Sequence, residues 1–156
     1  MLITDTGPLV ALLNSKDKHH AACADLFRFY RQPIIIPAPV VTEVAQFLEF
    51  EPGPQVEAAF LDALARRELL VEATTDQDFA RMAQLVRQYS DFPLGTADAS
   101  VVAVAERLGI TKVATIDPEH FHAVKPLHCD AFELLPAGLV VEKRPRKAKR
   151  GHDAKR

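Results

Sequence analysis

The chain has 156 residues and a net charge of −2, and its 48% hydrophobic and 26% charged residues are typical of a globular domain rather than a disordered or fibrous protein. No apolar run approaches the roughly 20 residues that a membrane-spanning helix needs, and Asp5 interrupts the N-terminal apolar stretch where a signal peptide would continue. These features predict a cytoplasmic protein with one substantial core, and they argue against export or membrane insertion.

The first half of the chain alternates short apolar strands with helical patterns. Leu2 to Thr4 is apolar and ends before Gly7-Pro8, and Ile34 to Ile36 are β-branched residues between two prolines, so both segments are predicted strands. Apolar residues at helical spacing predict helices between and after them. These predicted helices cover residues 17–31, residues from about 39 to the Pro52-Gly53-Pro54 break, and a segment from 56 onward.

The second half continues the alternation and contains the most apolar helix. A short apolar segment at 69–71 is followed by predicted helices around 79–86 and at 96–108, then by predicted strands at 112–116 and 132–135. The 96–108 helix, with Thr96 as its expected N-cap, is apolar on nearly every side and should be central. Strands that alternate with helices predict a parallel sheet covered on both faces, with sites beyond the carboxyl ends of the strands.

The end of the chain is strongly basic. Residues 143–156 hold 8 of the 19 Lys and Arg and one of the 21 acids, a net of +7, which leaves −9 on the preceding residues. Such a run predicts a disordered tail, with contact to a polyanion as an open possibility. The expected organisation is one folded domain over 1–135 and a basic tail over 136–156.

Four acids stand where a soluble fold would not place them without a reason. Asp5 and Asp117 lie at the tips of apolar strands, and Glu43 and Asp98 share helical faces with apolar neighbours and are expected to point inward. Each acid alone is more simply a helix cap or a salt-bridge partner. Together they are expected to converge at one end of the sheet, where mutual repulsion would require a cation.

The ligand type indicates which cation. Oxygen donors without a Cys or His cluster favour Mg²⁺ or Mn²⁺, and a carboxylate-held ion that keeps its water suits phosphodiester hydrolysis. His120 and His122 flank Phe121 two positions apart, a spacing at which they cannot easily chelate one ion together. The residues therefore predict a metal-dependent nuclease site built from acids.

These residues occur in a known arrangement. The stretches are LITDTGPLVALLNSKDKHH at 2–20, PAPVVTEVAQFL at 37–48, YSDFPLGTADASVVAVAERLGI at 89–110 and KVATIDPEHF at 112–121. In this order they resemble the PIN-domain ribonucleases, most closely the VapC-type toxins of type II toxin–antitoxin pairs. The family's acidic quartet falls on Asp5, Glu43, Asp98 and Asp117, and Thr6 and Thr115 match hydroxyl positions that support the metal site.

The resemblance implies a PIN-like three-layer α/β/α fold and a single-stranded RNA endonuclease that needs Mg²⁺ or Mn²⁺. It also implies a homodimer held inactive by a VapB-type antitoxin, whose C-terminal segment would lie in a groove lined by the early helices. We expect a basic side chain of that partner to enter the carboxylate cluster. The candidate apolar anchors for the partner are Phe27, Tyr30, Phe47 and Phe50.

Three other functions remain in view. A phosphatase with Asp5 as covalent nucleophile would need a second Asp where this chain has Gly7, which argues against it. A receiver domain would need an acid pair near the first strand and a Lys after the last, and neither is found. The remaining alternative is a non-catalytic PIN-like scaffold that binds RNA without cutting it, although such proteins commonly lose one or more acids. Cleavage of RNA in a metal titration would separate the nuclease from all three.

Overall fold

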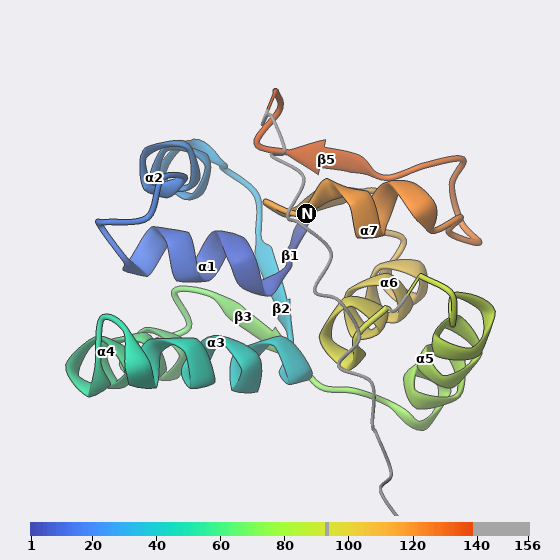
Figure 1. Cartoon of the computed structure of the whole chain (residues 1–156), viewed down its shortest axis with the longest axis horizontal. Helices are drawn as coiled ribbons and strands as arrows, with labels where there is room; N and C mark the ends of the chain where they lie inside the picture. Colours follow the sequence, from blue (N-terminus) through green and yellow to red (C-terminus); the bar gives the residue numbers. More distant parts are fainter. Residues whose placement is uncertain (93, 139–156) are drawn as a thin grey trace, which may run out of the picture.

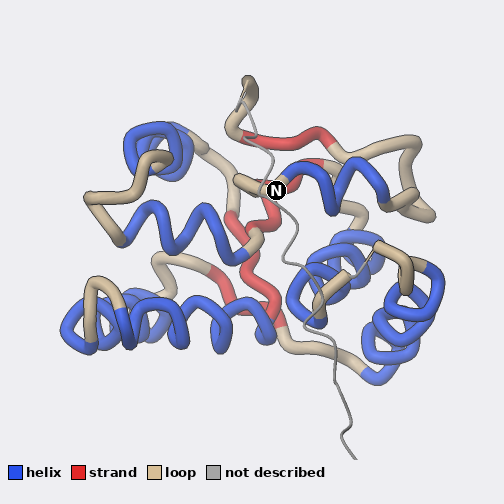
Figure 2. Tube along the Cα trace, in the orientation of Figure 1, coloured by secondary structure: helices blue, strands red, loops and turns tan. Residues whose placement is uncertain are grey.

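The computed structural model describes residues 1–92 and 94–138. This part of the chain forms one sheet in the order β3-β2-β1-β4-β5, in which every neighbouring pair is parallel. The strands are β1 (Leu2–Thr4), β2 (Ile34–Pro37), β3 (Leu70–Glu72), β4 (Lys112–Ala114) and β5 (Glu133–Leu135). Figure 2 shows the strands running from the middle of the molecule towards its top, with helices on either side. The predicted three-layer α/β/α fold with a central parallel sheet is confirmed.

The helices cover both sides of this sheet. In Figure 1, α1, α2 and α4 lie to the left of the central strands, and α5, α6 and α7 lie to the right. The helices are α1 (Thr6–Leu13), α2 (His20–Phe29), α3 (Ala38–Phe50), α4 (Pro54–Ala65), α5 (Asp76–Gln88), α6 (Thr96–Leu108) and α7 (Pro118–Ala123). None of the helices in these ranges is long and apolar enough to cross a bilayer.

β1 is the central strand, and it pairs with β2 from the first half of the chain and with β4 from the second half. Ile3 pairs with Ile35 on one side and with Val113 on the other. All three residues of β1 are buried, as a parallel sheet covered on both faces requires. Because the strands are parallel, the residues that follow β1 and β4 leave the sheet at the same edge.

The prediction that the helix near residue 100 is central is confirmed. Every residue of α6 from Ala99 to Ala105 is buried, and α6 contacts α3, α5, β1 and β2. The helix ends at Gly109, whose φ of 67° is a left-handed conformation that suits glycine. The predicted N-cap was wrong by one residue, because Gly95 takes the extended N-cap conformation and Thr96 is already helical.

Two helices were not predicted, and one begins later than predicted. α1 and α7 each carry a proline in the first turn, where no amide hydrogen is needed, so a Pro that seemed only to end a strand also begins a helix. α2 starts at His20 rather than at 17, because the Asp17 carboxylate accepts the His19 N–H at 2.7 Å and forms a turn instead. The predicted tail at 136–156 lies outside the described residues from 139 onward, so the division at 135 stays a prediction.

Candidate carboxylate site

Asp5 is the most deeply buried acid of the predicted quartet. It follows β1 directly, serves as the N-cap of α1, and is 6% exposed. Its Oδ1 accepts the Thr6 N–H at 2.7 Å, and its Oδ2 accepts the Thr115 hydroxyl at 3.2 Å. Burial, together with the nearby Asp98 and Glu43 carboxylates, raises the pKa of Asp5 from 3.8 to about 7 despite these two donors. The surroundings of Asp5 therefore favour its protonated form.

Glu43 reaches the cluster through Thr6. The Thr6 hydroxyl donates to Glu43 Oε2, which ties α3 to the start of α1, and Glu43 itself is partly buried. The apolar face from which Glu43 was expected to point inward is buried only in part. Val40 is fully buried, but Phe47 is 55% exposed and Phe50 is 85% exposed, because no described element covers the last turns of α3 on that face.

Asp98 enters the site from the first turn of α6. Its side chain is 16% exposed, and Oδ2 lies 3.1 Å from His120 Nδ1. The Gly95 N–H donates to the same oxygen at 3.2 Å, so Asp98 also caps its own helix. Asp98 is therefore a helix cap, as the simpler interpretation of this acid predicts, and it is also a member of the carboxylate cluster.

Asp117 lies at the rim of the cluster, and Thr115 links it to Asp5. β4 ends at Ala114, so Asp117 is three residues past the strand, and it is exposed. Its N–H donates to the Thr115 hydroxyl at 3.0 Å, the same hydroxyl that donates to Asp5. Thr6 and Thr115, both predicted to support the site, each contact an acid of the quartet.

His120 is a site residue that sequence reasoning missed. The hydrogen bond to Asp98 raises the pKa of His120 above its usual value, against the effect of burial, and the Asp117 and Asp5 carboxylates add to the rise. The two-residue spacing of His120 and His122 indicates only that they cannot easily share one ion. The useful signal was its position three residues after Asp117, within one turn of a proline-led helix.

The donor chemistry of this cluster fits a hard divalent cation. The acids offer only oxygen ligands, and the pKa of Asp5 is raised first by burial and then by repulsion from the Asp98 and Glu43 carboxylates. In the arrangement seen, however, no three or more Asp, Glu, His or Cys side chains among the described residues are grouped so as to hold an ion. Glu43 accepts a hydrogen bond from the Thr6 hydroxyl, and Asp98 interacts with the His120 ring.

The fold and the cluster define a class of α/β proteins with an acidic site at the carboxyl ends of parallel strands. The family model for the PIN domain matches residues 2–126, and the chain belongs to this family. It is 27% identical over 135 residues to Ribonuclease VapC26 of Mycobacterium tuberculosis, a match that covers 86% of this chain and 100% of the relative.

Solved structures agree on the fold. VapC20 of Mycobacterium tuberculosis, a toxin that cleaves the sarcin-ricin loop, superposes with a TM-score of 0.75 at 18% identity, over 83% of this chain and 99% of its own. The VapBC2 complex of Rickettsia felis, bound to a promoter DNA fragment, gives a TM-score of 0.63 at 15% identity, over 85% of this chain and 97% of that one.

Proposed function

We propose that this protein is a metal-dependent endoribonuclease and the toxin of a VapC-type type II toxin–antitoxin module in the cytoplasm. The observation that carries the proposal is the burial of Asp5 beside two further carboxylates, which raises its pKa to about 7. A fold that kept such a cluster without a ligand would lose stability at neutral pH. Membership of the PIN family and the likeness to a named ribonuclease support an RNA substrate.

Each residue of the cluster has a distinct part in this proposal. Asp5, Glu43, Asp98 and Asp117 hold Mg²⁺ or Mn²⁺, and the bound cation supplies water activation and charge stabilisation at a phosphodiester. Thr115 orients Asp5 and, by accepting the Asp117 N–H, fixes the turn that carries Asp117. Thr6 orients Glu43. These supporting hydroxyls limit the rotation of the acids before any ligand arrives.

Metal-dependent cleavage is tested with purified protein and a labelled single-stranded RNA in Mg²⁺, in Mn²⁺ and in excess chelator. We expect cleavage in either metal, none in chelator, and a loss of several orders of magnitude in Glu43→Gln. Glu49→Gln is the matched control, since Glu49 is an exposed acid on the same helix. Cleavage that persists in chelator, or that falls equally in both variants, would refute the assignment.

The proposed silencing partner is an antitoxin that delivers an Arg to the acids. A guanidinium binds carboxylates through paired hydrogen bonds and would compete with the metal. An apolar pocket of about 550 Å³ is lined by Phe27, Tyr30 and Leu9 among others. It lies between α1, α2 and α4 at the amino ends of β2 and β3, and it suits an apolar partner segment. We expect the upstream gene product to co-purify and to inhibit less after an Arg-to-Ala change or in excess Mg²⁺.

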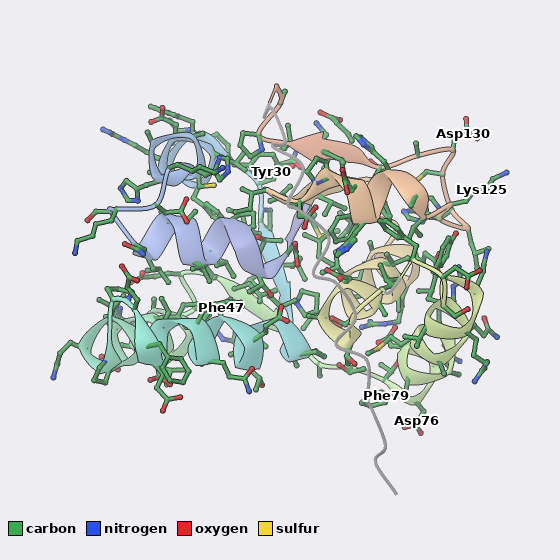
Figure 3. All side chains as sticks on the ribbon, viewed as in Figure 1. Tyr30, Phe47, Asp76, Phe79, Lys125 and Asp130 are labelled. Atoms are coloured by element: carbon green, nitrogen blue, oxygen red, sulfur yellow. The ribbon has the colours of Figure 1, made fainter. Side chains whose placement is uncertain are left out.

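Phe47 and Phe50, the other two candidate anchors, do not line this pocket. Figure 3 labels Tyr30 near the end of α2 and Phe47 on α3, on separate elements. With Leu61 of α4, which is 46% exposed, Phe47 and Phe50 leave apolar side chains on the surface of α3 and α4. We assign these side chains to the interface of the proposed homodimer. Sedimentation of the Phe50→Glu variant tests this assignment, because loss of the interface would shift the protein from dimer to monomer.

One observation favours the alternative of a non-catalytic RNA-binding scaffold. Within residues 1–92 and 94–138, no three ligating side chains are grouped to hold an ion. The same assay distinguishes the two functions, because a scaffold would shift RNA in a gel in the presence of Mn²⁺ and leave it uncut.

A further inference from the structure

His120 contacts one particular oxygen of Asp98. Its Nδ1 lies 3.1 Å from Asp98 Oδ2, with the two side chains 30% and 16% exposed. The Gly95 N–H donates to the same Oδ2 at 3.2 Å. Both donors therefore meet on one oxygen, and no described residue donates a hydrogen bond to Oδ1 of Asp98.

The His120 ring is itself fixed from another element. The Phe92 ring packs edge to face against it, with ring centroids 5.3 Å apart and planes at 82°. Such a pair restricts rotation of the imidazole. His120 is thus held between an aromatic side chain from the α5–α6 connection and a carboxylate from α6, and its own helix begins next to Asp117.

We propose that His120 is a positioning residue for Asp98, which holds Oδ2 so that Oδ1 stays free as a ligand oxygen for the divalent cation. This inference rests on the proposed metal-dependent function. A neutral or a charged imidazole serves equally well, because only a donor at Nδ1 is required. Carboxylate ligands of metals are commonly held by such a second hydrogen bond.

The opposite role makes the opposite prediction. If His120 merely occupied the place of the cation at Asp98, it would have to withdraw before binding, and its removal would strengthen metal affinity. The contact with Phe92 argues against withdrawal, since it holds the ring in place from a second side. One carboxylate can also serve a donor and a metal at the same time through its two oxygens.

The test measures the Mn²⁺ dissociation constant of the full chain by calorimetry and by the EPR signal of free Mn²⁺. We expect His120→Ala to weaken binding by about 10- to 100-fold, the usual effect of losing such a partner. His120→Asn should bind close to wild type, because its amide nitrogen can replace Nδ1, and His120→Gln should not. His122→Ala is the matched control, as His122 is exposed on the same short helix.

The outcomes separate this inference from the proposed function. Unchanged or tighter binding by His120→Ala overturns the positioning role while the metal site stands. Rescue by Gln but not by Asn also overturns it, because the acting atom would then be Nε2. If His120→Ala fails to fold in a circular dichroism melt, the comparison of Asn with Gln decides. A wild-type protein that binds no Mn²⁺ refutes the metal in the proposed function itself, and the positioning role with it.

Discussion

Asp5 combines burial with a surrounding of other carboxylates, and the consequence is a dependence of stability on pH. The pKa of Asp5 is raised from 3.8 to about 7, so between these values the folded protein keeps a proton that the unfolded chain releases. The unfolding free energy therefore falls as pH rises from about 4 to about 7, and the stabilisation is lost above that range.

Replacement of Asp5 by Asn should remove this dependence. In metal-free buffer we expect Asp5→Asn to be more stable than wild type at pH 8, by about 2 to 4 kcal/mol, and nearly equal to it at pH 4, where Asp5 is protonated in the folded protein and partly protonated in the unfolded chain. Urea unfolding at both pH values measures the difference, and added Mn²⁺ should narrow it by stabilising only the wild type. An identical difference at the two pH values would show that Asp5 is not the titrating group.

Thr115 is 2% exposed and serves two acids at once, since it donates to Asp5 and accepts from the Asp117 N–H. Thr115→Val keeps the shape but removes both bonds. We expect a loss of about 1 to 3 kcal/mol in unfolding free energy, because polar groups are left without partners. Thr115→Ser keeps the hydroxyl and should lose much less. A Val variant as stable as the Ser variant would contradict this linking role.

At the scale of elements, the site depends on a close approach between the start of α1 and the turn after β4. A Cβ added at Gly7 would lie 2.5 Å from Cγ1 and 3.0 Å from Cδ1 of Ile116. Real atoms do not approach so closely, so glycine permits the turn of Asp117 to lie beside the turn of Asp5.

Gly7→Ala should therefore destabilise the fold by about 1 to 3 kcal/mol through overpacking. The control is the double variant with Ile116→Ala, which removes the atoms that clash. We expect the double variant to lose less unfolding free energy than the sum of the losses in the two single variants. A double-mutant cycle, in which the wild type, both single variants and the double variant are unfolded, measures this difference. Simple additivity would mean that the close approach does not constrain the two turns.

The elements that sequence could predict are those with a strong local pattern. The strands at 2–4 and 34–37 and the apolar helix α6 follow from β-branched runs and helical periodicity. α1 was missed because Gly7-Pro8 resembles a break, whereas Pro8 falls in a first turn capped by Asp5. The role of His120 was missed because it depends on Asp98, a residue of another element, and local spacing carries no information about such a contact.

At the scale of the whole molecule, the charge is unevenly distributed: residues 1–142 carry a net charge of −9 and residues 143–156 a net charge of +7. We therefore expect the basic segment to contribute to RNA affinity and the acidic residues before it to hold the cleavage site. A chain ending at residue 138 should bind RNA more weakly, with the largest loss at low salt. The plot of log affinity against log salt should become shallower by about 0.7 for each phosphate contact removed. Titrations at several salt concentrations measure both slopes, and equal slopes would exclude a contribution from the basic segment.

The central place of β1 has a consequence for how the protein is made. Asp5 leaves the ribosome early, yet its N–H bonds to the carbonyl of Ala114 and its carboxylate to Thr115. These partners are separated from it by most of the domain, and the sheet cannot close around β1 until they have been synthesised. A nascent or prematurely terminated chain thus has no assembled carboxylate site. Any toxic activity of this site can begin only after nearly the whole polypeptide has been synthesised. An inhibitor translated from the same messenger can therefore be present before the site is active.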